Sequence, residues 1–432
     1  MSDTSPAFPF RIAAGHLLRF VGLFLPVTAA VLLFGGRAVA EGLRNPPPGG
    51  FGLSRAGGKI AHVDDASAIH HNPANIVGIQ DLTASVAPNF VYISADFQSS
   101  ITGGTASTKD PWKILPNLFA VIPLKEDRYT LGLGVVTPYG LSNEWERQGA
   151  YGPGGILRYA SPYYTELKTI NVQPTFAARI NENFSAGIGV DIMWSDLDFR
   201  QIFPTFLLGG VGDGDMRARA QGTGYGFNLG LTYKIGDRHT LAATYRSPIS
   251  INYDGKFTMG NPPPGTPTRS TFGSHIKYPT IVGLGYGLQV TEDVRIGADF
   301  EWLQWSNFNQ LPVGVGAPPP GLPTGLNQNW SNGFTAGIAG DWQINENWAV
   351  RGGYQFYDSP IPDHNFSNSI PGSDQNVLTV GLGWKSGRQR VELAFSEVFY
   401  KRRNITSNQN PALLGTHKTT VHLFALTYQI GF

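Results

Sequence analysis

The sequence predicts an all-β protein, a 14-stranded antiparallel transmembrane β-barrel with a small N-terminal domain inside its lumen. Three observations support this fold class. Apolar and polar residues alternate with period two in many segments, the first forty residues resemble an export signal, and the chain ends in an alternating strand closed by Phe432. We therefore divide the chain into residues 1–40, a signal peptide, residues 41–80, the inner domain, and residues 81–432, the barrel.

The N-terminal residues have the features of a secretory signal. Arg11 and Arg19 give a basic start, and residues 20–34, FVGLFLPVTAAVLLF, form an apolar run that is short for a membrane span. Ala38-Val39-Ala40 is an A-x-A cleavage pattern. We predict cleavage after Ala40. The alternative, an N-terminal membrane anchor, is disfavoured by the length of the run.

Composition excludes several classes of partner and cofactor. The precursor has 32 basic and 31 acidic residues, so it is close to neutral and gives no sign of a nucleic-acid partner. The chain has no cysteine, which excludes disulfides and thiolate metal sites. His70 and His71 lie near Asp64 and Asp65, but their spacing fits no zinc pattern. We expect no metal and no cofactor.

The alternating segments distinguish a membrane barrel from a soluble β-sandwich. In residues 184–194, 227–235, 294–302 and 348–356 one face is apolar, while the other carries small, polar or charged residues. Charged second faces suit a solvated lumen better than a dry core. Tryptophans also gather at the ends of these segments, as in an interfacial belt: Trp194, Trp302, Trp342, Trp348 and Trp384.

The connections give the strand count. Short polar turns are predicted at residues 125–128, 181–183, 236–239, 291–293, 345–347 and 386–389. Longer connections rich in Pro, Gly and Asn lie between them, which is the asymmetry of an outer-membrane barrel. Six short turns and seven long loops join fourteen strands. Residues 41–80 remain, and the lumen is the simplest place for them. Within them Asp64 and Asp65 are expected to cap a short helix that Pro73 ends.

The third strand, LGLGVVTPYGLSNEWE, contains an irregularity. Pro138 cannot donate a hydrogen bond to a ladder, and Gly140 tolerates unusual backbone dihedrals. We expect a bulge or break at Thr137, Pro138, Tyr139 and Gly140. The alternative is an ordinary bulge without a role.

Four collinear blocks of the chain resemble one family. They are residues 57–79, GGKIAHVDDASAIHHNPANIVGI, residues 224–257, residues 302–311, WLQWSNFNQL, and residues 354–365, YQFYDSPIPDHN. They resemble the FadL-type (FadL/TodX, OmpP1) outer-membrane transporters of long-chain fatty acids and other hydrophobic compounds. Asn72-Pro73-Ala74 matches the NPA motif of the family's N-terminal hatch, so the resemblance identifies residues 41–80 as a hatch domain.

The resemblance implies a location and a mechanism. It places the chain in the outer membrane of a Gram-negative bacterium, as a passive transporter and not an enzyme. Capture at outer loops, hatch movement and lateral release at the strand break would follow, with Asn72-Pro73-Ala74 pressed against that break. The first expected ligand is a long-chain fatty acid. A neutral aromatic or alkyl hydrocarbon taken up by the same route, and less strongly a general porin, are the alternatives.

Ligand-binding residues are assigned by the same resemblance. Phe206, Leu207 and Leu208 in the third long loop would form part of the first hydrophobic groove. Arg200 lies one residue from the place of the family's pocket arginine, and a shift of one residue in a strand changes the face. Residues 309–330 contain no lysine or arginine, although fatty-acid members of the family have a lysine there. Because this lysine is missing, we keep a neutral hydrocarbon as the alternative ligand.

The expected partners are a hydrophobic small molecule, outer-membrane lipid and the barrel-assembly machinery. That machinery would read the terminal strand, in which Phe424, Leu426, Tyr428 and Ile430 take every second place before Phe432. We expect a monomer. A membrane hydrolase is disfavoured because the chain has no G-x-S-x-G pattern and His422 has no evident nucleophile beside it. An adhesin would need longer loops.

Overall fold

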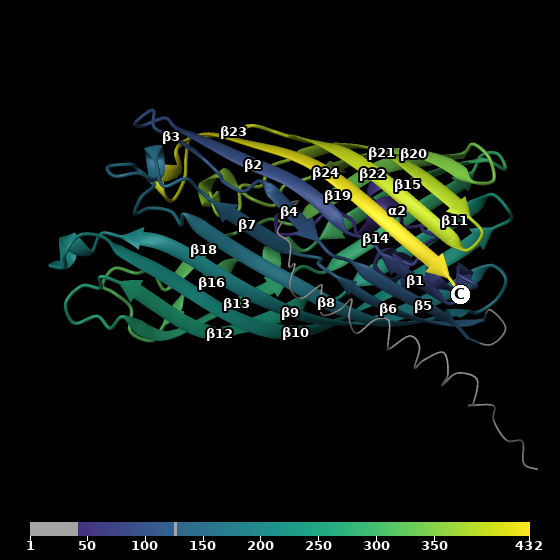
Figure 1. The fold of residues 1–432 in the computed structure, drawn as a ribbon, viewed down its shortest axis with the longest axis horizontal. Coiled ribbons are helices and arrows are strands. Elements are labelled where there is room, and N and C mark those ends of the chain that lie inside the picture. The colour runs from purple at the N-terminus through teal and green to yellow at the C-terminus, as the bar shows by residue number, and fades with distance from the viewer. Residues whose placement is uncertain (1–41, 125–127) are drawn as a thin grey trace, which may run out of the picture.

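A computed structural model describes residues 42–124 and 128–432 of the protein, so the predicted signal peptide lies outside the described residues. The described chain forms one closed antiparallel barrel (Figure 1). The barrel closes where the last strand, β24 (Gly415–Gly431), pairs with the first two segments, β1 (Thr83–Val86) and β2 (Asn89–Ser99). Counted as crossings of the wall, the strands number fourteen within the described residues, as predicted.

Several crossings are interrupted, so the wall contains more strand segments than crossings. In chain order the segments after β2 are β3 (Thr105–Ser107), β4 (Trp112–Leu115), β5 (Leu118–Pro123), β6 (Tyr129–Val136), β7 (Gly140–Glu144), β8 (Tyr164–Arg179), β9 (Phe184–Phe203), β10 (Gly214–Ile235), β11 (His239–Arg246), β12 (Ile249–Gly260), β13 (Arg269–Tyr278), β14 (Ile281–Gln289), β15 (Val294–Leu303), β19 (Gly333–Gln343), β20 (Trp348–Tyr357), β21 (Gln375–Ser386), β22 (Gln389–Tyr400) and β24.

The two ends of the barrel differ, as the spacing of the turns predicts. Five predicted short turns lie between consecutive strands at the end of the barrel where the chain terminates, and the sixth includes residues 125–127, which are not described. The opposite end carries the long connections (Figure 1). These connections contain β16 (Gln310–Pro312), β17 (Gly314–Val315), β18 (Gly325–Asn327), β23 (Arg403–Ile405), and the 3₁₀ turns η3 (Gly149–Tyr151), η4 (Thr205–Leu208), η5 (Trp305–Asn307), η6 (Asp363–Asn365) and η7 (Pro411–Leu413).

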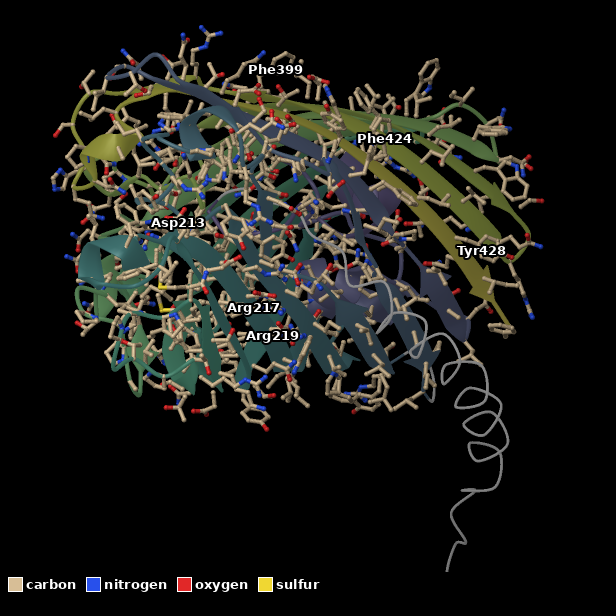
Figure 2. The ribbon with its side chains drawn as sticks, turned by 60° about the vertical axis from the view of Figure 1, so that its left-hand side comes forward. Asp213, Arg217, Arg219, Phe399, Phe424 and Tyr428 are labelled. Atoms are coloured by element: carbon tan, nitrogen blue, oxygen red, sulfur yellow. The ribbon has the colours of Figure 1, made fainter. Side chains whose placement is uncertain are left out.

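The outer surface of the wall is apolar over a broad band. On β9 the side chains of Ile188 and Val190 are exposed, while Asp191 and Met193 on the other face are buried. Figure 2 shows Phe424 and Tyr428 of β24 and Phe399 of β22 on the outer surface, and all three are exposed. The predicted inward and outward faces are therefore correct. Among residues 42–124 and 128–432, no helix is long and apolar enough to cross a membrane.

Residues 42–80, named the plug here, fill the lumen. Helix α2 (Gly49–Ser54) packs against β20, β21, β22 and β24, while η1 (Pro73–Gly78) packs against β6, β8, β9 and β10 on the other side. Between them lies the short helix α3 (Ala68–His71), and the Asp65 carboxylate accepts hydrogen bonds from the backbone N–H and the hydroxyl of Ser67 just before it. The predicted short helix before Pro73 is therefore confirmed, but its N-cap is Ser67 rather than Asp64 or Asp65.

The lumen is less wet than the sequence suggests. Asp299, Glu301 and Arg351 point inward as expected, yet all three are buried against the plug. The charged side chains of the inner face therefore contact residues 42–80 and do not line an open, water-filled channel.

Candidate functional site

The third crossing of the wall is broken where the sequence predicts it. Strand β6 ends at Val136 and β7 begins at Gly140, so Thr137, Pro138 and Tyr139 lie outside both. On the short-turn side of the break, β6 pairs with both β5 and β8. On the long-loop side, β7 pairs with β8 but not with β4, which pairs with β2 instead. The ladder resumes only at the bridge between Thr108 and Trp145. The wall therefore has a gap between β4 and β7.

The first residues of the plug occupy the edge of this gap. The backbone N–H of Asn45 donates to the Pro138 carbonyl at 2.9 Å, and the N–H of Gly140 donates to the Leu43 carbonyl at 2.9 Å. The Asn45 side-chain amide adds a bond of 2.7 Å to the Thr137 carbonyl. Residues 43–45 thus form a short antiparallel addition to the broken strand.

This arrangement corrects one expectation about Asn72-Pro73-Ala74. The motif was expected to press against the break, but Asn72, Pro73 and Ala74 lie against Gly187 of β9 and Gly230 of β10. The Asn72 amide donates to the Thr232 hydroxyl at 2.9 Å, and a Cβ built on Gly187 would lie 2.4 Å from the Pro73 carbonyl carbon. Glycine at position 187 therefore allows the close approach. Pro73 and Pro138 do line one cavity, so the motif faces the break across a space.

That inner cavity is small and has both charged and apolar residues in its lining. Its volume is about 60 Å³, and charged side chains of the plug and of β15 line it. Arg44 pairs with Glu301 at 2.9 Å, and the ammonium of Lys59 lies 3.7 Å from the carboxylates of both Glu301 and Asp299.

An aromatic layer caps the inner cavity on the side of the long loops. Its members are buried and in ring contact: Tyr139, Tyr278, Trp305, Phe308 and Trp330. Tyr139 belongs to the break, and its ring centroid lies 4.5 Å from that of Tyr278. The start of the plug touches the same layer, since a Cβ on Gly42 would lie 2.8 Å from Trp330.

A larger apolar chamber lies beyond the aromatic layer. Its volume is about 610 Å³, within the usual size range of ligand pockets. Strands β9, β10, β12 and β13 and the outer loops line it, and their large contributions are Phe199, Met216, Phe257, Phe272 and Leu311. Among the described residues that line it, none is Asp, Glu, Lys, Arg or His.

Arg200 does not reach this chamber, which corrects its assignment as a ligand-binding residue. Its neighbour Phe199 lines the chamber, so Arg200 projects from the opposite, outer face of β9. There its guanidinium pairs with Asp198 at 3.1 Å and lies over the Tyr164 ring at 4.3 Å. The one-residue shift noted in the sequence moves the cation to the other side of the wall.

The loop residues Phe206, Leu207 and Leu208 lie at the rim of the chamber. They are exposed on η4, directly after Phe203 and Pro204, which line the chamber. The Phe206 ring lies 6.1 Å from Tyr159, another lining residue. Their place suits capture of apolar molecules, and that role stays a prediction.

A network of ion pairs, most of whose members are buried, joins the plug to β15, β19, β20 and β22. Sequence reasoning missed this network because its members are far apart in the chain. Asp341 contacts three cations: Arg55 of the plug, Arg295 at 2.9 Å and Arg351 at 3.1 Å. Asp64 of the plug pairs with Arg295 at 2.9 Å and Arg390 at 2.8 Å, and Glu392 joins Arg390 to Arg351. The Phe51 ring lies beneath the guanidinium groups of Arg55, Arg351 and Arg390.

Burial within this charged plug changes its titration. Burial, and then the charge of Arg55, lowers the pKa of His62 to about 3. Burial and Lys59 lower the pKa of His71 to about 3, and burial and Arg246 lower the pKa of His70. These imidazoles are neutral at physiological pH. Burial would raise the pKa of Asp64, but Arg390 and Arg295 hold it below its usual range.

Comparison with known proteins gives consistent matches over the whole described fold. Residues 33–432 match the family described as outer membrane protein transport protein (OMPP1/FadL/TodX). The chain is 27% identical over 395 residues to the long-chain fatty acid transport protein of Escherichia coli O6:H1, covering 82% of this chain and 86% of the relative. It is 21% identical over 407 residues to outer membrane protein P1 of Haemophilus influenzae, covering 83% and 86%.

Solved structures show the same fold. A FadL homologue of Pseudomonas aeruginosa superposes with a TM-score of 0.78 at 21% identity, covering 90% of this chain and all of that one. The toluene transporter TodX of Pseudomonas putida gives a TM-score of 0.71 at 18% identity, covering 90% and 99%.

Proposed function

The chain belongs to the OMPP1/FadL/TodX family of outer membrane transport proteins. We propose that it takes up hydrophobic compounds by passive diffusion and releases them sideways through an opening in its own wall. It is a β-barrel of a Gram-negative outer membrane. The observation that carries the proposal is the pairing of an uncharged apolar chamber with a gap in the wall that residues 43–45 occupy.

A sideways exit has a physical reason. Transfer of an apolar compound from a pocket into water costs about 0.8 kcal/mol for each methylene group. A long alkyl chain would lose roughly 10 kcal/mol on leaving through an aqueous lumen. Release between β4 and β7 leads directly into hydrocarbon and avoids this cost. The route needs no energy source beyond the concentration gradient.

The proposed path follows the cavities. Phe206, Leu207 and Leu208 capture the compound at the rim, and the chamber holds it against Phe199 and Phe257. Passage through the aromatic layer then displaces residues 43–45 from Pro138 and Gly140. The gap opens while the rest of the plug stays in place, so the plug acts as a hatch through its first residues.

The chamber favours a neutral ligand over an ionised fatty acid. A carboxylate buried there would have no cation among the lining residues, and burial of an unpaired charge is costly. A long-chain fatty acid remains the second candidate for one specific reason: the relatives at 24% to 27% identity are long-chain fatty acid transport proteins. The toluene transporters among the structural neighbours share the fold but not a close sequence.

Uptake by cells that lack a transporter of this class tests the proposal. The cells receive a labelled long-chain fatty acid and a labelled neutral aromatic hydrocarbon side by side. We expect wild type to admit the neutral compound faster, and Ala218→Lys in the chamber to shift the preference toward the fatty acid by about tenfold or more. Thr258→Lys, on the outer face of β12, is the matched control and should leave the preference unchanged.

Two outcomes contradict the proposal. If neither compound enters above background while small sugars do, the protein is a general porin. If wild type prefers the fatty acid and Ala218→Lys does not change the preference, the uncharged chamber does not select the ligand.

A further inference from the structure

The outer face of β8, β9, β10 and β12 carries an unusual group of charges toward the long-loop end of the barrel. On β10 the exposed side chains of Tyr225, Phe227 and Leu229 belong to the apolar band, and Arg217 and Arg219 continue the same face of that strand. Figure 2 labels both arginines on the wall. Strand pairing adds further outward cations, which together form the cationic array: Lys168, Arg200, Arg217, Arg219 and Lys256.

Two carboxylates of this face, Asp196 and Asp198, lie beneath the arginines, while two others, Asp215 and Asp254, are exposed beside the array. The side chains of Asp196 and Asp198 are each 6% exposed, whereas those of Arg217 and Arg219 are 41% and 55% exposed. Arg217 binds Asp198 at 2.6 Å, and Arg219 binds Asp196 at 3.0 Å. Arg200 shares Asp198 from the other side. The carboxylates therefore fix the guanidinium groups, which still have N–H donors directed outward.

Cross-strand stabilisation alone does not account for this arrangement. Ion pairs with one exposed partner contribute little to stability, with a median of about 0–1 kcal/mol. Strands β21, β22 and β24 and the residues after them also have exposed cations: Lys385 on β21, Lys418 on β24, and Lys401 and Arg402, which follow β22. Lys401 pairs with Asp374. The array differs from these in placing five cations side by side on one face of four neighbouring strands, directly beyond the edge of the apolar band.

We propose that the cationic array binds the phosphate groups of an anionic glycolipid in the outer leaflet of the membrane. Guanidinium groups bind phosphate oxygens in a bidentate way, and cations next to a bilayer attract anionic headgroups. The acyl chains of the same lipid would lie on Tyr225, Phe227 and Leu229, next to the array on the same strand. This continuity between charge and apolar surface is what selects a lipid over a free anion.

The test uses the full-length protein with the double substitution Arg217→Gln and Arg219→Gln. This variant leaves both buried carboxylates with partners, because Asp198 keeps Arg200 and Asp196 keeps the Gln221 amide at 2.7 Å. The matched control, Lys401→Gln with Lys418→Gln, removes the same charge from the opposite wall. Heat-dependent mobility in a denaturing gel verifies that each barrel is folded.

Native mass spectrometry then counts bound glycolipid on barrels purified in mild detergent. We expect the Arg217→Gln, Arg219→Gln protein to bind added lipid A, a diphosphorylated glycolipid, about tenfold or more weakly than wild type, and the control to equal wild type. Dephosphorylated lipid A should bind wild type as weakly as the variant binds intact lipid A. Lys256→Gln, which removes a single exposed charge, should weaken the binding of lipid A by a smaller factor.

Three results would overturn the proposal. The first is equal binding by the double variant and wild type. The second is equal binding of intact and dephosphorylated lipid A. The third is displacement of the lipid by inorganic phosphate at the same concentration, which would identify a simple anion site. Ligand uptake plays no part in these readouts, so the proposal stands or fails independently of the transport route.

Discussion

The two sides of the plug are held in place in different ways. Toward β15, β19, β20 and β22, charges of the plug meet charges of the wall, with the buried Arg55 and the exposed Asp64 each in contact with opposite charges across the boundary. Toward the gap, residues 43–45 are held by three hydrogen bonds to the break. This difference is the basis of our proposal that the plug moves at its start and stays anchored elsewhere.

Rough magnitudes support that division. Removal of one partner from a buried ion pair costs about 3–5 kcal/mol, while an ordinary hydrogen bond contributes about 0.5–1.5 kcal/mol. Release of residues 43–45 also separates Arg44 from Glu301, but Glu301 keeps Lys59 at 3.7 Å. The Asn45 Oδ1 and Thr137 Oγ1 atoms are buried without a hydrogen-bond partner among the described residues, which lowers the stability of this contact.

The largest expected effect comes from Asp341→Asn on the anchored side. Three arginines would lose their shared carboxylate, and we expect the docking of the plug to weaken by about 3–5 kcal/mol. Hydrogen exchange of residues 42–80 should accelerate, and ion conductance in planar bilayers should rise.

The control for this change is Asp374→Asn, which removes a carboxylate from an exposed pair with Lys401. Such a pair is worth about 0–1 kcal/mol, so the plug should keep its exchange rates. Equal exchange in Asp341→Asn and wild type would mean that the network does not anchor the plug.

A smaller effect is expected where the plug meets β9. In Gly187→Ala the new methyl group would lie 2.4 Å from the Pro73 carbonyl carbon, so the backbone of the plug must shift. Overpacking of this kind costs about 1–3 kcal/mol. Limited proteolysis of the plug measures the change. Gly78→Ala is the matched control, because a methyl group there has open space. If the plug is equally resistant to proteolysis in the two variants, the close contact between Pro73 and Gly187 does not stabilise the docked plug.

The smallest effect is a dependence on pH. Burial lowers the pKa of His71 to about 3, against about 6.5 when it is exposed, so the exposed state gains the proton first as pH falls. The docked plug is therefore fully stabilised above pH 6.5 and loses stability as pH decreases toward 3. At pH 6 the loss from His71 is about 1 kcal/mol. Hydrogen exchange of residues 42–80 at pH 7.5 and pH 6 tests this, and identical protection would contradict it.

The fold was predictable because its signals are local. Alternation identifies the faces of β9 and β10 one residue at a time, and short polar turns separate consecutive strands. The break at Thr137–Gly140 was predictable for the same reason, since Pro138 has no N–H to donate to a neighbouring strand. The end of the short helix before Pro73 was predictable in the same way, although its N-cap is Ser67 and not Asp64 or Asp65.

The parts that were missed depend on contacts distant in sequence. Arg55 and Asp341 are separated by 286 residues, and nothing near either one identifies the other. Residues 43–45, and not Asn72-Pro73-Ala74, form hydrogen bonds with the break. Where the plug docks depends on wall glycines, such as Gly187, that leave room for its backbone. Arg200 was misplaced because one residue of shift reverses the face of a strand.

One disulfide tests the central claim, that residues 43–45 must leave the break for transport. Arg44 and Tyr139 form a bridge flanked by two hydrogen bonds, a pairing whose Cα atoms lie about 4.5 Å apart and which a disulfide can span. The chain has no cysteine of its own, so Arg44→Cys with Tyr139→Cys gives one defined crosslink. Uptake of the neutral hydrocarbon by the oxidised protein should fall to background and return on reduction. In each single-cysteine variant, the oxidant should leave the uptake rate unchanged. Equal uptake by the oxidised and reduced forms would contradict the account, because transport would then proceed with the plug fixed to the break.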